Sequence, residues 1–349
     1  MLVGMSGGVD SSVAAALLKG LGFELAGLSV NALSCDRGAE APCCSARDRE
    51  DARRVCEAIG IPHFTFDMRA EFRREVVEPF VAGYLAGLTP SPCVVCNEKI
   101  KFRALLGEAE RLGFDAVATG HYARVARIDG RAVLLRAADE RKDQSYFLCR
   151  LGEETLSRVV FPLGALTKEE VRRIAAEMGL PTRAKRESQE ACFVSNEGCA
   201  AFVEERAGEE LPGPGFFVDV GGKRLCRHRG IHAYTVGQRR GLGFGSGRRQ
   251  YVVRIDAERN EVILGSDEEL MTREIVVGDI VRCGPPGELP REASVKIRST
   301  HAGSRAQVRH LGAARARVIF DEPVRAAAPG QAAVFYVGDE VAGSGWIER

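Results

Sequence analysis

The sequence contains no run of 18 or more apolar residues, and no basic leader precedes its first apolar segment, which begins at Met1. Without these features we expect no membrane span and no signal peptide. The sequence therefore predicts a cytoplasmic protein with no membrane partner. Internal repeats and low-complexity tracts are also lacking. The 349 residues are enough for two or three domains at roughly 150 residues each.

An excess of charge of either sign is missing as well, because 49 Lys and Arg against 48 Asp and Glu leave a net charge of +1. This balance hides an uneven distribution. Segments 221–255 and 293–320 hold nine and six basic residues without an acid, so the other 286 residues carry a net charge of −14. Basic blocks of this kind attract polyphosphate backbones, whereas the alternative is a solvated arginine-rich β surface.

The first half of the chain alternates short apolar runs with helical patterns. The runs predict buried strands at 1–5, 23–30, 62–66 and 115–119, and the helical patterns predict helices at 11–19, 48–59, 71–85, 99–112 and 168–178. Strands separated by helices are typical of an α/β fold with a doubly wound parallel sheet, whose ligands bind at the carboxyl ends of the strands.

The pattern changes after about residue 195 to short alternating segments with Gly and Pro. Segments 211–217 and 241–247 indicate a β-rich region. From about residue 271 the predicted strands are 274–277, 294–297, 314–319 and 331–336, which favour a small β-barrel.

A glycine- and serine-rich loop, SGGVDSS at 6–12, follows the first strand and leads into an apolar helix. Glycines allow a tight turn, while the hydroxyls and the N–H groups of the first helical turn form an anion cradle. The P-loop pattern requires a lysine that this loop lacks, so we expect a different nucleotide site. The alternative without a ligand is a strand-to-helix turn with a Ser or Asp cap. His121, at the end of a predicted strand, is placed to face the ligand crevice or to serve as a packing residue.

The 11 cysteines are odd in number, which argues against a disulfide scaffold and for thiol or metal chemistry at a few of them. Cys93 and Cys96 form a CxxC just before the helix predicted at 99–112, where the helix N-terminus lowers a thiol pKa. One CxxC has too few ligands for a closed zinc site, and Cys192 is the candidate partner. Cys43 and Cys44 are weaker candidates, since neighbouring thiols point differently. The remaining cysteines are predicted to be apolar fillers or incidental thiols: Cys35, Cys56, Cys149, Cys199, Cys226 and Cys283.

In combination these motifs resemble one family, the bacterial tRNA-specific 2-thiouridylases, which convert the wobble uridine of certain tRNAs to 2-thiouridine. The resemblance covers nearly the whole chain and rests on SGGVDSS, CCS before DARRVC, PCVVCNEKIKF, ATGHYARV, KDQSYFL, SQEACFV, IHAYTVGQRRGLG and PGQAAVFY. It implies a PP-loop adenylating α/β domain at 1–195, a small central β-rich domain at 196–268 and a C-terminal β-barrel at 269–349 that grips tRNA. It also implies ATP and Mg²⁺ as cofactors, a sulfur donor or persulfide carrier protein as partner, and a monomer when free.

The resemblance further implies roles for individual residues. Cys96 would be the nucleophile, Cys192 the carrier of the incoming persulfide, and Asp10 a catalytic aspartate that helps to hold Mg²⁺ against the pyrophosphate. The residues implied to bind ATP are Gly4, Met5, Ser6, Gly7, Gly8, Val9, Asp10, Ser11, Val30 and Gly120. Those implied to meet the target base are Ser91, Pro92 and Cys93, and those implied to contact tRNA are His121, Lys142, Asp143, Gln144, Arg298, Ser299 and Gln331.

Two positions depart from the family pattern. Many members have Asn-Pro-Asp where this chain has Ser91-Pro92-Cys93, and many have Arg-Tyr where it has Arg298-Ser299. Serine has no π face on which a base can stack. The extra thiol of Cys93 leaves two sulfur routes open.

In the persulfide route, Cys192 carries the terminal sulfur that attacks the adenylated uridine, and Cys96 releases it by forming a disulfide. In the cluster route, Cys93, Cys96 and Cys192 hold a [4Fe–4S] cluster whose open iron binds sulfide. The third thiol favours the cluster. Two other functions remain as alternatives: a PP-loop amidating ligase acting on a small molecule, and a non-enzymatic iron–sulfur RNA-binding protein.

Overall fold

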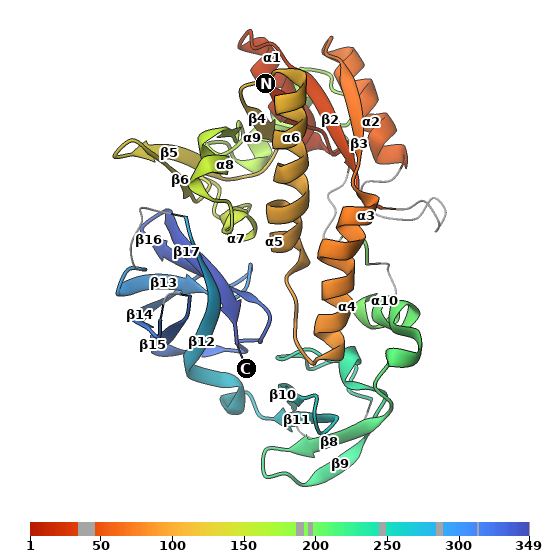
Figure 1. Cartoon of the computed structure of the whole chain (residues 1–349), viewed down its shortest axis with the longest axis vertical. Helices are drawn as coiled ribbons and strands as arrows, with labels where there is room; N and C mark the ends of the chain where they lie inside the picture. Colours follow the sequence, from red (N-terminus) through yellow and green to blue (C-terminus); the bar gives the residue numbers. More distant parts are fainter. Residues whose placement is uncertain are drawn as a thin grey trace.

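The computed structural model describes residues 1–33, 46–185, 192–194, 198–243, 249–283, 289–312 and 314–348. Three sheets organise the chain, and Figure 1 shows the parallel sheet at one end, a small sheet at the other and the barrel beside them. No helix within these residues is long and apolar enough to cross a membrane. Cys43 and Cys44, two of the predicted thiol candidates, lie outside the described residues, as does Cys35.

The N-terminal sheet has five parallel strands in the order β3-β2-β1-β4-β7, which confirms the predicted doubly wound fold. The strands are β1 Leu2–Gly4, β2 Ala26–Asn31, β3 His63–Asp67, β4 Val117–Thr119 and β7 Val159–Val160. The central strand is fully buried at Leu2 and Val3 because helices cover both faces. Its carboxyl end therefore opens directly onto the serine-rich loop.

Ten α-helices are described, together with π-helical stretches at Arg73–Val77 and Asn97–Lys101 and 3₁₀ turns at Gly208–Glu210, Ile231–Ala233 and Glu268–Leu270. The α-helices are α1 Val9–Gly20, α2 Ala46–Ala58, α3 Arg69–Phe72, α4 Glu78–Leu85, α5 Pro92–Cys96, α6 Phe102–Leu112, α7 Ser145–Leu148, α8 Glu153–Ser157, α9 Lys168–Glu177 and α10 Gly198–Ala207. The helix predicted at 168–178 agrees with α9, but α10 falls where only β structure was predicted.

The helix predicted at 99–112 begins earlier than expected. Helix α5, the π-helical stretch and α6 follow one another without a break, so the helical segment starts at Pro92. Proline suits this first position because its missing N–H would have no partner there in any case. The CxxC is therefore the first turn of the helix and not a segment that precedes it.

The central sheet has four strands in the order β10-β11-β8-β9. They are β8 Gly215–Asp219, β9 Arg224–His228, β10 Tyr251–Asp256 and β11 Glu261–Gly265. The strand predicted at 211–217 thus begins four residues later. The described part of predicted segment 241–247, residues 241–243, lies in no strand.

The C-terminal barrel closes with six antiparallel strands in the order β12-β15-β14-β13-β16-β17, and β17 pairs back to β12. They are β12 Met271–Arg282, β13 Glu292–Lys296, β14 Ser304–His310, β15 Ala316–Arg325, β16 Ala332–Val337 and β17 Glu340–Ile347. The interior is filled by Val, Ile, Ala and Phe side chains, as in other small closed barrels. The predicted barrel is confirmed.

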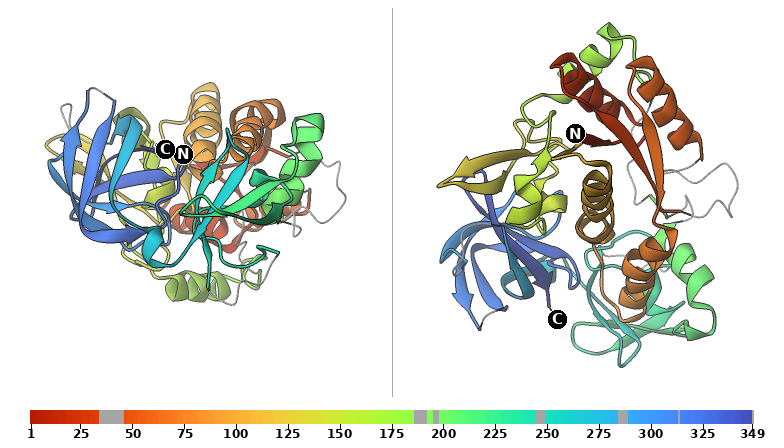
Figure 2. Two further views of the ribbon diagram at one scale, coloured as in Figure 1. Left: turned by 90° about the horizontal axis from the view of Figure 1, so that it is seen from below. Right: turned by 45° about the horizontal axis from the view of Figure 1, so that its top comes forward.

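A hairpin of the N-terminal half, β5 Arg124–Ile128 with β6 Arg131–Leu135, extends the sheet of the barrel. Strand β6 meets β17 where Leu135 pairs with Glu340. Both views of Figure 2 place this yellow hairpin next to the blue barrel. The sequence patterns did not predict it.

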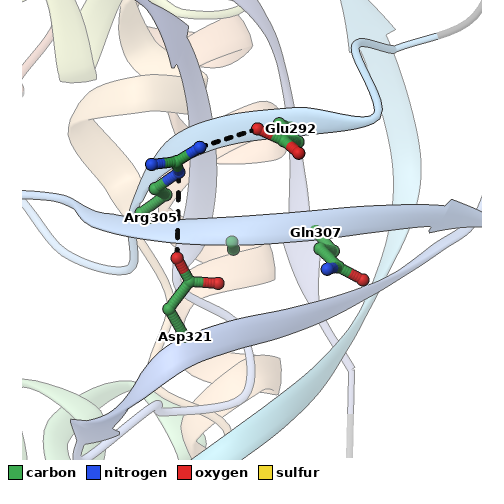
Figure 3. A pocket seen from close by; sticks show the side chains of 5 residues that line it. Glu292, Arg305, Gln307 and Asp321 are labelled. Carbon is green, nitrogen blue, oxygen red and sulfur yellow. Dashed lines mark hydrogen bonds and ion pairs between the residues drawn. The ribbon is translucent and has the colours of Figure 1, made fainter.

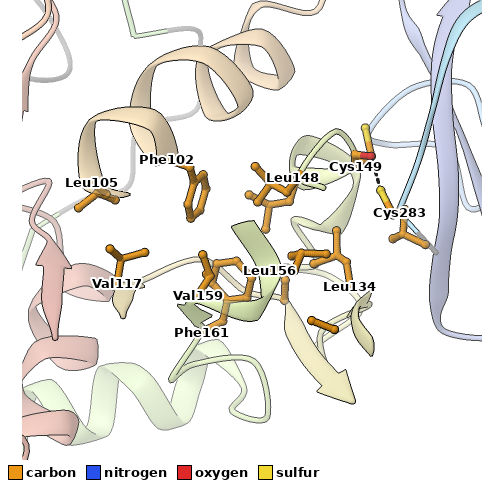
Figure 4. Close-up of a cluster of buried hydrophobic side chains, with 14 of the residues drawn as sticks. Phe102, Leu105, Val117, Leu134, Leu148, Cys149, Leu156, Val159, Phe161 and Cys283 are labelled. Carbon is orange, nitrogen blue, oxygen red and sulfur yellow. Dashed lines mark hydrogen bonds between the residues drawn. The ribbon is translucent and has the colours of Figure 1, made fainter. Parts of the chain in front are cut away.

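A buried hydrophobic cluster continues across the same junction. The thiol of Cys283, directly after β12, donates to the carbonyl of Cys149 at 2.7 Å, and both residues lie among Leu134, Leu148 and Leu156 (Figure 4). Burial raises the pKa of the Cys149 thiol to about 12, so this thiol stays protonated at neutral pH. Cys149 and Cys283 are therefore packing residues, as predicted.

Candidate active site

The loop between β1 and α1 depends on two glycines. Gly7 has a φ of +68°, and a Cβ there would lie 2.1 Å from the carbonyl oxygen of Asp48. At Gly120, after β4, a Cβ would lie 2.6 Å from the backbone of Asp10 and Ser11. Neither position accepts a larger residue without movement of the backbone. These contacts bring the loop against α2 and the end of β4.

The serines of this loop hold its turn in place. The Ser11 hydroxyl donates to the carbonyl of Gly8 at 3.2 Å and accepts from the backbone N–H of Ser6 at 3.2 Å. The Ser12 hydroxyl donates to the same Gly8 carbonyl at 2.7 Å. Gly8 is the extended N-cap residue of α1, so the first turn of the helix starts at the loop. A loop of this kind at a helix N-terminus suits a phosphate group.

Asp10, in the first turn of α1, is held by two residues that the sequence analysis did not single out. The ammonium of Lys168 donates to both carboxylate oxygens of Asp10, at 2.6 and 2.8 Å, and the hydroxyl of Tyr122 donates to one of them at 2.9 Å. The Lys168 side chain is only 8% exposed, whereas Asp10 is 32% exposed. One face of the carboxylate therefore points toward solvent beside the loop.

A second lysine contacts the loop from the segment after α9. The ammonium of Lys185 donates to the carbonyl of Gly7 at 2.9 Å and to the carboxylates of Asp48 and Asp51 at 2.6 and 2.5 Å. Burial alone would lower the pKa of Lys185, but the two carboxylates outweigh it and raise this pKa above its usual value. Just before it, the Thr182 hydroxyl donates to Ser12 at 2.9 Å. This segment therefore covers the loop.

Cys96 and Cys192 lie in the same hydrophobic cluster although they are far apart in the sequence. Cys96 is 7% exposed, and Cys192 packs against the cluster from its edge. The ring of Phe193 fixes the position of Cys192, because it makes edge contacts with Phe72 and Phe80 at centroid distances of 5.7 and 5.1 Å. Both thiols for which the family resemblance implied a shared role therefore belong to one cluster, and that shared role stays a prediction.

The same cluster reaches the carboxyl ends of β2 and β3. Val30 and Ala32 belong to it from the β2 side, and Phe66 and Met68 from the β3 side. The serine-rich loop leaves the sheet at this same edge, from β1. The cluster that contains the thiols and the serine-rich loop therefore both reach the carboxyl ends of the strands, where ligands bind in parallel sheets.

The residues proposed to hold an iron–sulfur cluster do not fit one in this conformation. Across the part of the chain that the structure describes, no three His, Cys, Asp or Glu side chains come close enough to bind a metal ion. Cys93 is exposed, while Cys96 points into the hydrophobic cluster. The predicted three-thiolate site at Cys93, Cys96 and Cys192 is thus not supported. For Mg²⁺, the open face of Asp10 offers a carboxylate oxygen of the type that this ion prefers.

His121 lies between aromatic rings at the end of β4. Its Nδ1 is 2.7 Å from the Thr119 hydroxyl, and its ring is 5.9 Å from Phe102 and 6.1 Å from Phe161. Burial, together with the charge of Lys101, lowers the pKa of His121 to about 3. The imidazole is therefore neutral near pH 7, and its predicted tRNA contact stays a prediction.

The residues at 142–144 mainly organise the protein itself. The Asp143 carboxylate accepts from the backbone N–H groups of Ala137 and Ser145, both at 3.1 Å, and its side chain is 3% exposed. The Gln144 carboxamide oxygen accepts from the N–H of Tyr122 at 2.9 Å. Lys142 is partly exposed. These contacts fix the start of α7, and the contact of the three residues with tRNA stays a prediction.

Gln331 of the barrel reaches the loop that precedes the CxxC helix. Its carboxamide N–H donates to the carbonyls of Thr89 and Pro90 at 2.8 and 3.2 Å. The backbone N–H of Thr89 in turn donates to the carbonyl of Pro329 at 2.8 Å. The barrel therefore holds the two residues just before the predicted target-base segment, where Ser91 is buried, Pro92 is partly buried and Cys93 is exposed.

The other barrel residues predicted to contact tRNA lie after β13. The Arg298 guanidinium donates to the carbonyl of Arg325 at 2.7 Å, and Ser299 is exposed. Their contact with tRNA stays a prediction.

Comparison with known proteins identifies the family of the chain. Residues 1–196, 200–266 and 272–347 match the family models described as tRNA methyl transferase HUP domain, tRNA methyl transferase PRC-barrel domain and aminomethyltransferase beta-barrel domain. The chain is 48% identical over 355 residues to the tRNA-specific 2-thiouridylase MnmA of Chloroflexus aggregans, covering 100% of this chain and 98% of the relative. The chain belongs to the tRNA-specific 2-thiouridylase family.

Another 2-thiouridylase, from Geobacter metallireducens, is 48% identical over 356 residues and is covered over 96% of its length. Among solved structures, a 4-thiouridine synthetase in complex with RNA and ATP aligns with a TM-score of 0.38 at 19% identity, over 55% of this chain and 44% of that chain.

Some arginines of the predicted basic block at 293–320 form ion pairs in the folded chain. In block 293–320, three exposed arginines pair with acids outside the block: Arg305 with Glu292 and Asp321, Arg315 with Glu348, and Arg317 with Glu274. Figure 3 shows Arg305 between its two carboxylates. These residues line a pocket of about 140 Å³ on the barrel. Lys296 of the same block is buried. Much of its positive charge is therefore neutralised locally.

Two arginines of the central sheet, in the basic block at 221–255, form no ion pair among the described residues. Within the described residues, no carboxylate lies within ion-pair distance of Arg224 or Arg227, which both stack over the ring of Phe216 at 4.5 and 5.4 Å. Arginines on an aromatic ring are held in place yet stay charged. This sheet is therefore the stronger electrostatic candidate for RNA contact.

The sequence patterns did not single out Lys168 or Lys185, and only one of these two lysines has a signal in the sequence. Lys168 is the first residue of α9, where a cation opposes the helix dipole, and this unusual placement is a signal in the sequence. Lys185 lies beyond the helix and gives no such signal. Only the fold brings it to the loop.

Proposed function

We propose that the chain is an ATP-dependent tRNA sulfurtransferase that adenylates O2 of the wobble uridine and replaces this oxygen with sulfur, forming 2-thiouridine. One observation carries the proposal. Cys96 and Cys192 belong to one hydrophobic cluster, and that cluster reaches the same edge of the parallel sheet as the serine-rich loop. The membership of the chain in the 2-thiouridylase family supports the choice of tRNA as substrate.

The loop would serve the first half of the reaction. O2 of the uridine attacks the α-phosphorus of ATP, the bond between the α and β phosphates breaks, and pyrophosphate leaves with the bonding electron pair. The residues for this step are the loop 6–12, with Gly4, Met5, Val30 and Gly120 around it. When bound by Asp10, Mg²⁺ would neutralise charge on the leaving pyrophosphate. The step converts a poor leaving group into AMP.

The two thiols would serve the second half. We propose that a persulfide carrier protein loads sulfur onto Cys192, and that the terminal sulfur attacks C2 while AMP departs with the original oxygen. The Cys96 thiolate then attacks the sulfur of Cys192, which releases 2-thiouridine and leaves a Cys96–Cys192 disulfide. An external thiol reductant restores both thiols for the next turnover.

The structure favours this persulfide route over the cluster route on one ground. Cys93 is exposed and joins no group of three metal ligands among the described residues. In the persulfide route the Cys93 thiol has no chemical role, and we place Ser91, Pro92 and Cys93 at the target base. In the cluster route Cys93 is indispensable. The two routes therefore differ in what a Cys93→Ser variant does.

The test incubates the full chain with unmodified tRNA, ATP, Mg²⁺ and a persulfide donor, and measures the mass of the wobble nucleoside. We expect sulfur to replace oxygen in the native protein and in Cys93→Ser, and no product in Cys96→Ser or Cys192→Ser. Loss of both activity and bound iron in Cys93→Ser after anaerobic purification would establish the cluster route. Activity retained in a Cys96→Ser, Cys192→Ser double variant would favour an amidating ligase. Absence of ATP turnover would favour a non-enzymatic RNA-binding protein.

A further inference from the structure

Lys168 is a buried cation whose position needs an explanation. It is the first residue of α9, its side chain is 8% exposed, and its ammonium donates to both carboxylate oxygens of Asp10. Burying an ammonium costs several kcal/mol in solvation unless an anion faces it. The helix adds to this cost, because its N-terminus carries a partial positive charge. The chain therefore keeps a lysine at a place that disfavours a cation.

Its geometry is tightly defined. Thr167 caps α9, and the reciprocal hydrogen bonds between Thr167 and Glu170 form a complete capping box that fixes the first turn. The backbone N–H of Lys168 also donates to Asp139 at 3.0 Å. Helices α1 and α9 pack directly on each other through a shared hydrophobic cluster. The ammonium is thus delivered to the first turn of α1, beside the phosphate-binding loop.

Asp10 cannot serve Lys168 and a metal ion equally. Both carboxylate oxygens already accept from the Lys168 ammonium, and Tyr122 donates to one of them. A divalent cation on the open face of Asp10 would repel the ammonium and compete for the same oxygens. The ammonium then needs a new anion within reach, and the phosphates of a nucleotide on the loop are the anions present.

We propose that Lys168 is a ligand of the β- and γ-phosphates of ATP, held on Asp10 before the nucleotide binds and transferred to the phosphates when Mg²⁺ takes its place on Asp10. The proposal rests on the ATP-dependent function proposed above. Lys168 would recognise the part of ATP that leaves as pyrophosphate and would contribute nothing to recognition of the adenosine. Lys168 would therefore make the site bind ATP more tightly than AMP.

The test measures equilibrium binding of ATP, pyrophosphate and AMP by calorimetry in the presence of Mg²⁺. In Lys168→Met we expect affinity for ATP and pyrophosphate to fall about tenfold to a hundredfold, the loss typical of one charge-assisted hydrogen bond, while AMP affinity stays within about twofold. The matched control is Arg173→Met, which removes a cation from the exposed face of the same helix, where Arg173 is 66% exposed. It should change none of the three affinities.

Several outcomes would overturn the proposal. Equal losses for ATP and AMP, accompanied by a lower melting temperature, would show that Lys168 only stabilises the fold through Asp10. Unchanged ATP affinity would show that it stays on Asp10 throughout. If Lys168→Met does not fold, Lys168→Arg decides, because a planar guanidinium should lower the ratio of ATP to AMP affinity and an unchanged ratio would contradict the proposal. A native protein that binds ATP but fails to thiolate tRNA would refute the proposed function and leave this result standing.

Discussion

Gln331→Ala tests whether the barrel positions the segment that meets the target base. The carboxamide of Gln331 donates to the carbonyls of Thr89 and Pro90 at 2.8 and 3.2 Å, immediately before Ser91. Each lost hydrogen bond costs about 0.5–1.5 kcal/mol, so the variant should lose about 1–3 kcal/mol in free energy of unfolding. Gln331→Glu should lose more, because it turns a carboxylate of the same size toward two carbonyl oxygens.

The assay combines chemical denaturation with single-turnover thiolation at saturating tRNA. We expect the thiolation rate to fall about fivefold or more in Gln331→Ala, because an increase of about 1 kcal/mol in activation free energy slows a reaction by that factor. The tRNA Kd should change by less than about twofold. Gln307→Ala is the matched control, because Gln307 is an exposed glutamine on the same barrel. We expect it to behave like the native protein in every measurement.

One result would refute this reasoning. If Gln331→Ala keeps the native stability and the native rate at saturating tRNA, and only its tRNA Kd rises, then the side chain acts by touching the RNA. The hydrogen bonds to Thr89 and Pro90 would in that case have no part in catalysis. The role implied by the family resemblance would stand alone.

Two further predictions concern charge and pH. Replacing both Arg224 and Arg227 with Gln should reduce the slope of log K for tRNA binding against log salt concentration by about two. Arg305→Gln should leave this slope unchanged, because the charge of Arg305 is already paired. Equal slopes for the two variants would contradict this assignment of the charges. His121 has a pKa of about 3 in the folded chain and an ordinary pKa of 6.5, so only the unfolded chain takes up its proton as the pH falls below 6.5, and stability is lost in that range. Between pH 7 and pH 5 the loss from His121 should be about 2 kcal/mol, and denaturant titrations should show a smaller loss in His121→Gln; an identical loss would show that other groups carry it.

Sequence patterns predicted the α/β half well because its signals are local. The loop at 6–12 stands between a buried strand and an apolar helix, and each of these elements is defined by its own residues. The barrel was predicted for the same reason, since its strands alternate and are separated by turns. The start of the CxxC helix was placed too late, because a proline at the first helical position looks like a break.

The missed features depend on contacts between distant parts of the chain. The hairpin β5–β6 looks like an isolated pair of short strands, and only its pairing with β17 explains where it lies. Lys185 acquires its role when α9 packs on α1 and carries the following segment to the loop. The pairing of Arg305 with Asp321 needs the register of two barrel strands. Local sequence patterns do not specify such contacts, because each depends on how separate elements pair or pack.

The sheet shared by the hairpin and the barrel limits how this protein can be dissected. A truncation after the α/β half would strip β17 from β6 and leave an unpaired strand edge exposed to other copies. It would also uncover Cys149, whose carbonyl accepts from the Cys283 thiol directly after β12 and from the Ser344 hydroxyl of β17. A fragment of this kind should self-associate, so the adenylation step is best isolated by point variants within the intact chain.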